Sequence, residues 1–150
     1  MAKETRFAHL IHLAQRSLFR AVDRSLRARL DIGSAQLGVL YYLHEHPGCT
    51  LGALSRGLML NNSAITGVVG RMREAGLVER QPLPNDRRTA RVVLTDRGRA
   101  VVQDAAPLLN HFNETIRHDF TEAELDTVRR FLERVIDRFS DHHEDMPHEQ

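Results

Sequence analysis

Disulfides and membrane spans are excluded by what this sequence lacks. The chain of 150 residues has a single cysteine, Cys49, which cannot form an intrachain disulfide and agrees with a reducing compartment. No apolar run approaches the roughly 18–20 residues that cross a bilayer, and residues 1–13 show no secretory signal. We therefore expect one cytoplasmic domain with no membrane partner.

Recognisable catalytic and metal-binding motifs are also lacking. An enzyme needs a nucleophile, a base and an orienting acid that converge, and no Ser, Cys or Gly-rich motif supplies such a set. His44 and His46 face different ways on a predicted helix, and His111 and His118 lie about two turns apart, too far for one ion without further ligands. We expect no cofactor, metal or catalysis; a small His/Cys-dependent enzyme is the alternative.

Lysine is almost absent, since Lys3 is the single lysine among 21 basic residues. The charge is also segregated: residues 51–100 carry nine arginines against four acidic residues, whereas residues 101–150 carry five against twelve. Arginine can fork onto phosphates and base edges. The pattern favours a polyanion as the partner of the middle segment, with a solvated charged face as the alternative.

Apolar residues at helical spacing are present through most of the chain. They predict helices over 3–29, 35–46, 50–57, 62–75, 96–116 and 121–139. The predicted N-caps are Ser34, Thr50, Asn61 or Asn62, and Thr121, and Gly76 is the predicted C-terminal stop of the fourth helix. Pro107 should kink or divide its helix near residues 103–107, and residues 141–150 should form a flexible tail.

The apolar period changes after Gly76. Residues 77–80 and 91–94 are short strand candidates joined by a polar turn, so they predict a β-hairpin. The order of elements predicts a mainly α fold with a small β-hairpin wing. We expect one domain over 1–140, with a winged helix-turn-helix core (31–98) flanked by long helices (1–30 and 99–140). Because their apolar stripes have no partner within that core, we expect these flanking helices to be dimerisation helices.

The helix over 62–75 has the features of a DNA-reading helix. If its apolar residues face the core, Ser63, Thr66, Gly67, Gly70 and Arg73 project elsewhere and form a small, hydrogen-bonding surface. Glycine inside a helix costs about 1 kcal/mol relative to alanine. Either close approach to DNA or close helix packing would explain the two glycines.

Residues 50–98 resemble the DNA-binding core of the MarR/SlyA family of bacterial transcription regulators. The resemblance is carried by Arg71, by "GLVER" at residues 76–80, by Asp86-x-Arg88 in the wing, and by Leu94-Thr95 with Gly98. It extends more loosely over residues 5–140. It implies a homodimeric, sequence-specific DNA-binding protein, cytoplasmic and nucleoid-associated, that acts on a pseudo-palindromic operator of double-stranded DNA.

The resemblance and the residue pattern together give a set of candidate DNA contacts. They are Asn62, Ser63, Thr66, Gly67, Arg71, Arg73, Asp86, Arg87, Arg88 and Arg91. As in the wing of the family, Asp86 can pair with Arg88, while Arg87 and Arg91 neutralise phosphates. Gly67 departs from the family, which often has arginine there, so one base contact is absent or supplied by a neighbour.

The resemblance further implies a repressor that a small aromatic ligand relieves. The candidate ligand-binding residues, which combine rings and cations, are His12, Arg16, Phe19, Tyr42, His44, His111 and Phe112. Some members of the family respond to metals or to oxidation. A metal- or oxidation-responsive regulator of the same fold, using the histidines or Cys49, is therefore the alternative.

Overall fold

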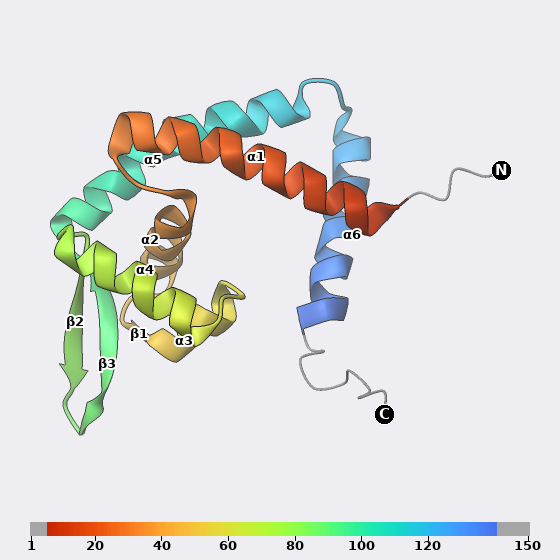
Figure 1. The fold of residues 1–150 in the computed structure, drawn as a ribbon. Coiled ribbons are helices and arrows are strands. Elements are labelled where there is room, and N and C mark those ends of the chain that lie inside the picture. Colours follow the sequence, from red (N-terminus) through yellow and green to blue (C-terminus); the bar gives the residue numbers. More distant parts are fainter. Residues whose placement is uncertain (1–5, 141–150) are drawn as a thin grey trace, which may run out of the picture. The chain divides into compact units, whose positions relative to one another are not determined.

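The computed structural model describes residues 6–140, apart from the side chains of residues 86–88 (Figure 1). The chain divides into two compact units, Met1–Leu109 and Asn110–Gln150. The predicted tail over 141–150 and the first residues of the first predicted helix lie outside the described residues, and the single domain over 1–140 stays a prediction. No helix within the described range is long and apolar enough to cross a bilayer.

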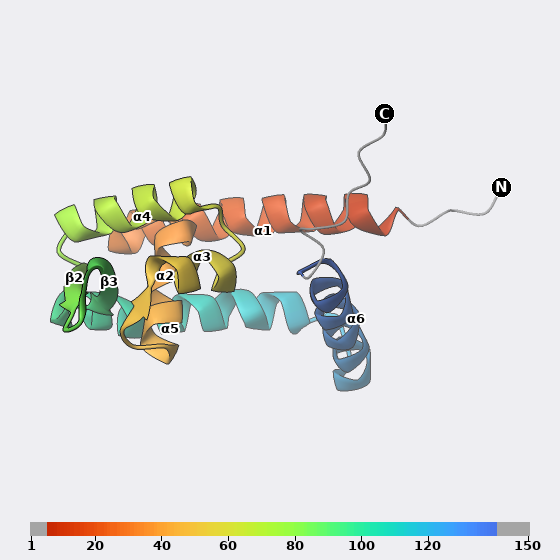
Figure 2. The same cartoon turned by 90° about the horizontal axis from the view of Figure 1, so that it is seen from below.

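The first unit has the order of elements that defines a winged helix-turn-helix, which confirms the predicted fold class. Its elements are α1 (Phe7–Leu30), α2 (Ser34–Glu45), β1 (Cys49–Thr50), α3 (Leu51–Gly57), α4 (Asn62–Glu74), β2 (Val78–Leu83), β3 (Asp86–Leu94) and the larger part of α5 (Asp96–Arg117). The β2–β3 hairpin projects from the helices in Figure 1 and is seen end-on in Figure 2.

The sheet has three antiparallel strands in the order β1-β3-β2. Val78 lies opposite Leu94 and Arg80 lies opposite Val92, so the predicted hairpin is confirmed, with longer strands than predicted. The third strand, β1, was not predicted; it pairs Cys49 with Val92. A strand of two residues is too short to show the alternation by which strands are recognised in a sequence.

The core of the first unit lies where the helices meet the sheet. Leu26 of α1, Leu40 of α2, Leu54 of α3, Met72 of α4 and Val92 of β3 are all fully buried. Burying an apolar side chain of this size contributes about 1.5–3 kcal/mol. This shared core fixes the position of α4 relative to the hairpin.

Local capping signals hold α3 and α4 as predicted. Thr50 Oγ1 accepts a hydrogen bond from the Ala53 N–H at 3.2 Å, and Asn61 Oδ1 accepts one from the Ala64 N–H at 2.7 Å. Gly76 follows the C-cap of α4 with a φ of 73°, a left-handed conformation that favours glycine. These caps set where the predicted DNA-reading helix begins and ends.

The predicted N-cap at Ser34 is wrong. Gly33 occupies the N-cap position of α2, and its N–H donates to Gln36 Oε1 at 2.9 Å. Ser34 is the first helical residue, and its N–H donates to Asp23 Oδ1 of α1 at 2.6 Å. Asp23 Oδ2 also accepts from Arg27 Nε at 3.0 Å. A carboxylate from α1 therefore takes part in capping α2.

Pro107 lies inside α5, which continues from Asp96 to Arg117. The predicted division of this helix is therefore wrong, and the predicted kink stays a prediction. Proline removes only one backbone donor, and Ala105 and Leu108 on either side of it are buried and hold the helix in place.

The second unit contains the end of α5 and α6 (Glu122–Ser140). The predicted capping box is confirmed, because the Thr121 N–H donates to Glu124 Oε2 at 2.8 Å and the Glu124 N–H donates to Thr121 Oγ1 at 3.3 Å. The structure describes all of α6, and none of its residues is buried.

Candidate nucleic-acid interface

Helix α4 has one buried face and one exposed polar face. Ile65, Val68, Val69 and Met72 are buried, as predicted. The predicted DNA contacts on α4, other than Gly67, are all exposed: Asn62, Ser63, Thr66, Arg71 and Arg73. The structure thus brings the α4 members of the predicted set together on the outer side of one helix.

The hydroxyl groups at the start of α4 can accept hydrogen bonds from a partner. Thr66 Oγ1 donates its proton to the backbone oxygen of Asn62 at 2.7 Å, so its oxygen can still accept, and the residue is exposed. Ser63 is exposed one turn earlier. Hydroxyl acceptors at this spacing fit the amino groups that adenine and cytosine present in the major groove.

The two glycines of α4 are not explained by packing within the described residues. A Cβ at Gly70 would have no atom within 4 Å, and a Cβ at Gly67 would meet only the side chain of Arg71, with Nη1 at 3.5 Å. Close helix packing, one of the two explanations considered from the sequence, therefore has no support in this part of the chain. The middle of the outer face of α4 is bare backbone.

The hairpin places Arg91 beside the short strand β1. Arg91 lies opposite Gln81 and Thr50 in the sheet register, and its side chain is exposed. Its Cδ lies 3.4 Å from where a Cβ at Gly48 would be, so its stem packs against the turn before β1. The side chains of Asp86, Arg87 and Arg88 lie outside the described residues, and the Asp86–Arg88 pair stays a prediction.

Further arginines lie at the base of the wing, where the sequence predicted a contact for Arg73 alone. Arg73 of α4 lines two open cavities of about 610 and 800 Å³, and Arg97 and Arg99 line the larger one. Arg99 is held by the carboxylate of Asp96 and by the Leu94 carbonyl oxygen at 2.9 Å. The excess of arginine in residues 51–100 was the signal that could have identified these side chains.

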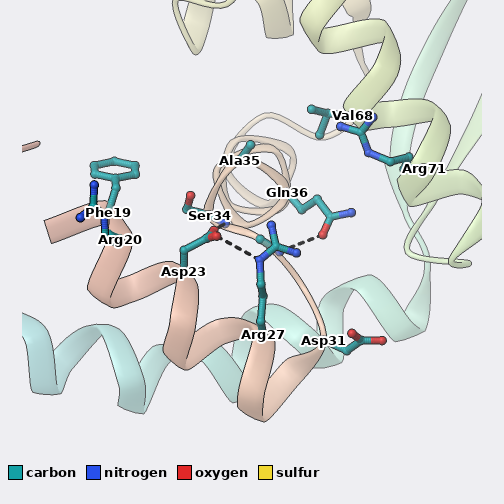
Figure 3. A pocket seen from close by; sticks show the side chains of 11 residues that line it. Phe19, Arg20, Asp23, Arg27, Asp31, Ser34, Ala35, Gln36, Val68 and Arg71 are labelled. Atoms are coloured by element: carbon teal, nitrogen blue, oxygen red, sulfur yellow. Dashed lines mark hydrogen bonds and ion pairs between the residues drawn. The ribbon is translucent and has the colours of Figure 1, made fainter. Parts of the chain in front are cut away.

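A third cavity, of about 550 Å³, lies between α1, the start of α2 and α4 (Figure 3). It is lined by Phe19, Arg20, Asp23, Arg27, Asp31, Gly33, Ser34, Ala35, Gln36, Val68 and Arg71. Figure 3 shows that α1 contributes an aromatic ring and charged groups, whereas Arg71 comes from α4. The mixture of ring and cations suits a small organic anion.

Asp23 organises the polar side of this cavity. The hydrogen bond from the Ser34 N–H, followed by that from Arg27, holds the pKa of the Asp23 carboxyl below its ordinary value. The carboxylate is therefore committed to these two donors, and within the described residues neither Arg20 nor Arg71 forms an ion pair with it.

Of the seven predicted ligand-binding residues, Phe19 alone lines this cavity. His12 and Arg16 are exposed earlier on α1, and Tyr42 stacks on His46 with ring centroids 4.3 Å apart. His44 is exposed on α2. His111 and Phe112 belong to the second unit, where their rings meet edge to face at 6.1 Å.

The sequence reasoning missed Arg20, Asp23 and Arg27 as cavity residues. Phe19, Asp23 and Arg27 are spaced four residues apart on α1 and so share one face of the helix. That spacing was the available signal. The start of α2, which closes the cavity, became evident only from the fold.

Cys49 is half-buried in β1, and this burial raises the pKa of its thiol. A raised pKa lowers the thiolate fraction and hence the reactivity of a cysteine. Within the described residues, no group of three or more His, Cys, Asp or Glu side chains is placed to hold a metal ion.

Comparisons with known proteins agree with this architecture. The MarR family model matches residues 30–89. The chain is 30% identical over 128 residues to the multiple antibiotic resistance protein MarR of Escherichia coli, covering 85% of this chain and 88% of that protein. It is 28% identical over 115 residues to the HTH-type transcriptional repressor IacR of Pseudomonas putida, covering 77% of this chain and 68% of that protein.

Solved structures show the same similarity. A cysteine-to-serine mutant of E. coli MarR complexed with operator DNA aligns with a TM-score of 0.81 and 28% identity, covering 88% of this chain and 94% of that one. The transcriptional regulator SlyA, at 19% identity, shares the fold with a TM-score of 0.85. These family members are regulators rather than enzymes. The chain belongs to the MarR family of winged-helix transcriptional regulators.

Proposed function

We propose that this protein is a homodimeric, sequence-specific DNA-binding regulator that represses transcription until a small aromatic acid releases it from its operator. The observation that carries the DNA-binding part is the exposed polar face of α4, which is capped at its start and rests on a fully buried opposite face. The similar MarR structure of E. coli, which contains operator DNA, supports the same reading.

The two parts of the interface have different tasks on DNA. Helix α4 enters the major groove, where Asn62, Ser63 and Thr66 hydrogen-bond base edges. The hairpin lies along the backbone or in the neighbouring minor groove, where Arg87 and Arg91 neutralise phosphates. The remaining members of the proposed interface are Gly67, Arg71, Arg73, Asp86 and Arg88. Asp86 orients Arg88, which enters the minor groove.

Selection of bound duplexes from a random pool tests sequence-specific binding. We expect one recovered pseudo-palindrome whose half-sites lie about one helical turn, roughly 10 bp, apart. Affinity for that duplex should fall steeply between low and moderate salt, because each neutralised phosphate releases counterions. A pool without a common sequence, or affinity independent of salt, would contradict DNA binding of this kind.

Exposed apolar residues on the long helices support the homodimer. Both α1 and α6 carry large apolar residues that are more than 40% exposed. They are Phe7, Leu10 and Leu13 of α1 and Val128, Leu132, Ile136 and Phe139 of α6. A monomer seldom exposes so many large apolar side chains on two helices, and a second copy of the chain would cover them.

The cavity beside α4 supports release by a ligand. Phe19 supplies a ring that can stack on an aromatic acid, and Arg20 and Arg27 supply cations for its carboxylate. The alternative site is the set predicted from the sequence, His12, Arg16, Phe19, Tyr42, His44, His111 and Phe112. A ligand that prefers the non-binding form by about 2–3 kcal/mol lowers DNA occupancy roughly 30- to 150-fold.

Thermal-shift measurements with benzoate and salicylate distinguish the two sites. We expect stabilisation of the wild type to be lost in Arg20→Ala and kept in Arg24→Ala, a matched exposed arginine of α1 outside the cavity. Loss in Arg16→Ala with retention in Arg20→Ala would favour the alternative site. Stabilisation that leaves DNA affinity unchanged would contradict a regulatory role of the ligand.

A further inference from the structure

Residue 67 has no side chain, yet the space beside it is occupied. Long side chains on a helix point back toward its N-terminus, onto the preceding turn. Arg71 follows this rule, and its Nη1 lies 3.5 Å from the position that a Cβ of Gly67 would take. The distance is ordinary van der Waals contact, so the guanidinium lies beside the position where a side chain of residue 67 would begin.

The Arg71 guanidinium is also uncommitted. Within the described residues it forms no ion pair, unlike Arg27, which is held by Asp23, and Arg99, which is held by Asp96. Asp23 is nearby in the same cavity, but its oxygens already accept from Ser34 and Arg27. No described residue pairs with the Arg71 guanidinium, so its donors are available to a partner outside the described part of the chain.

We propose that Arg71 is the specificity-determining arginine of α4 and that it reads a guanine in each half-site from the space that Gly67 leaves free. This inference rests on the proposed DNA-binding function and adds the residue and the base to it. Arginine pairs with the O6 and N7 acceptors of guanine through two parallel hydrogen bonds, a geometry that lysine does not reproduce. The side chains between Ser63 and Arg71 on the outer face are small, so none blocks this approach.

Arg73 is the other exposed arginine of α4, and its position differs. It lines the cavities at the base of the wing together with Val78 and Glu79. Arg71 instead lines the cavity on the α1 side of α4. The two arginines therefore lie on opposite sides of the two glycines of α4, Gly67 and Gly70, and only Arg71 lies beside Gly67.

The test compares operator preferences of four variants by duplex selection and competition binding. Arg71→Ala and Arg71→Lys should both lose preference for guanine at one base pair per half-site, by about 5- to 150-fold, while other positions keep theirs. Gly67→Leu should reproduce that pattern, because its side chain takes the space of the guanidinium. Arg24→Ala, a matched exposed arginine on α1, should keep every preference.

Two results would overturn the proposal. A phosphate contact would make Arg71→Lys resemble the wild type and would make Arg71→Ala weaken all duplexes equally, with a shallower salt slope. Wild-type preferences in Gly67→Leu would show that the space at Gly67 is not used. Failure of the proposed function itself is distinct, because the wild-type protein would then recover no common duplex.

Discussion

The glycines of the first unit differ in what a side chain would meet at each position. At Gly98, the second residue after the start of α5, a Cβ would lie 2.2 Å from the backbone oxygen of Leu77, which the structure does not tolerate. At Gly70 in α4, a Cβ would have no described atom within 4 Å. Gly98 is required by packing, whereas the absence of a side chain at Gly70 serves no contact within the described chain.

This difference predicts opposite effects of the same substitution. Gly70→Ala should raise the free energy of unfolding by about 0.5–1 kcal/mol, because alanine restricts the unfolded chain and favours a helix. Gly98→Ala should lower it by about 1–3 kcal/mol through overpacking. Urea unfolding measures both. If bare backbone at residue 70 serves DNA approach, Gly70→Ala should also weaken operator binding; a stabler protein with unchanged affinity would contradict that role.

Met59 lies in the turn between α3 and α4 with a φ of 52° and a side chain that is 61% exposed. A left-handed conformation costs an L-residue about 1–2 kcal/mol, and a glycine avoids that cost while losing more chain entropy on folding. Met59→Gly should therefore stabilise the protein by about 0.5–1 kcal/mol in thermal unfolding. Met59→Ala is the control: it keeps the Cβ and should give no gain. Equal stabilities of the two variants would contradict backbone strain at this turn.

Helices α1 and α2 are tied together by one carboxylate. Asp23 of α1 accepts hydrogen bonds from the first N–H of α2, at Ser34, and from Arg27. Helix N-termini leave N–H groups without partners, and a negative charge there also interacts favourably with the helix dipole. Asp23 thus connects α1 to the start of α2 and lines the cavity beside them.

Removal of this cap should destabilise the protein in a pH-dependent way. Asp23→Ala should cost about 1 kcal/mol at neutral pH. The folded-state pKa of Asp23 lies below the ordinary value of 3.8, so its contribution is fully present above about pH 4 and is lost as pH falls through the lower folded-state pKa.

Urea unfolding of the wild type and Asp23→Ala from pH 7 to pH 3 measures this dependence. The difference between the two proteins should shrink at the acid end of the range. A difference that stays constant down to pH 3 would contradict an ionised Asp23 cap.

At the scale of the whole molecule, α6 has an apolar stripe with no buried residue. Leu132, Ile136 and Phe139 are 42%, 53% and 72% exposed. The helix itself is well made, because Thr121 and Glu124 cap it and Arg129 pairs with Asp126 and Glu133 on its polar side. Sound local structure combined with an exposed apolar face supports the proposal that a second copy of the chain covers α6.

We therefore expect light scattering to give a mass of twice 17.1 kDa at micromolar concentration. Leu132→Asp combined with Ile136→Asp should shift the protein toward monomer and weaken operator binding, because two linked recognition helices bind one palindrome. Arg134→Asp, which places an aspartate at a polar position of the same helix, is the matched control and should remain dimeric. A wild-type monomer would contradict the proposed assembly.

Features that depend on a few neighbouring residues could be predicted. The caps at Thr50, Asn61 and Thr121 were predictable because a side chain reaches N–H groups only two or three residues away. Pro107 shows the limit of such local rules. A proline inside a helix predicts a break, but the buried neighbours Ala105 and Leu108 keep α5 continuous.

The sequence alone therefore determined the order of helices, the hairpin, the buried face of α4 and the family. Helical periodicity and capping act over one or two turns, and they are encoded in adjacent residues. Only the tertiary structure decided which distant groups meet: Asp23 with the start of α2, Cys49 with Val92, and the cavity that α1 shares with α4. These contacts depend on how the common core packs the helices. That packing is set by residues far apart in the sequence, so no single segment of the chain predicts it.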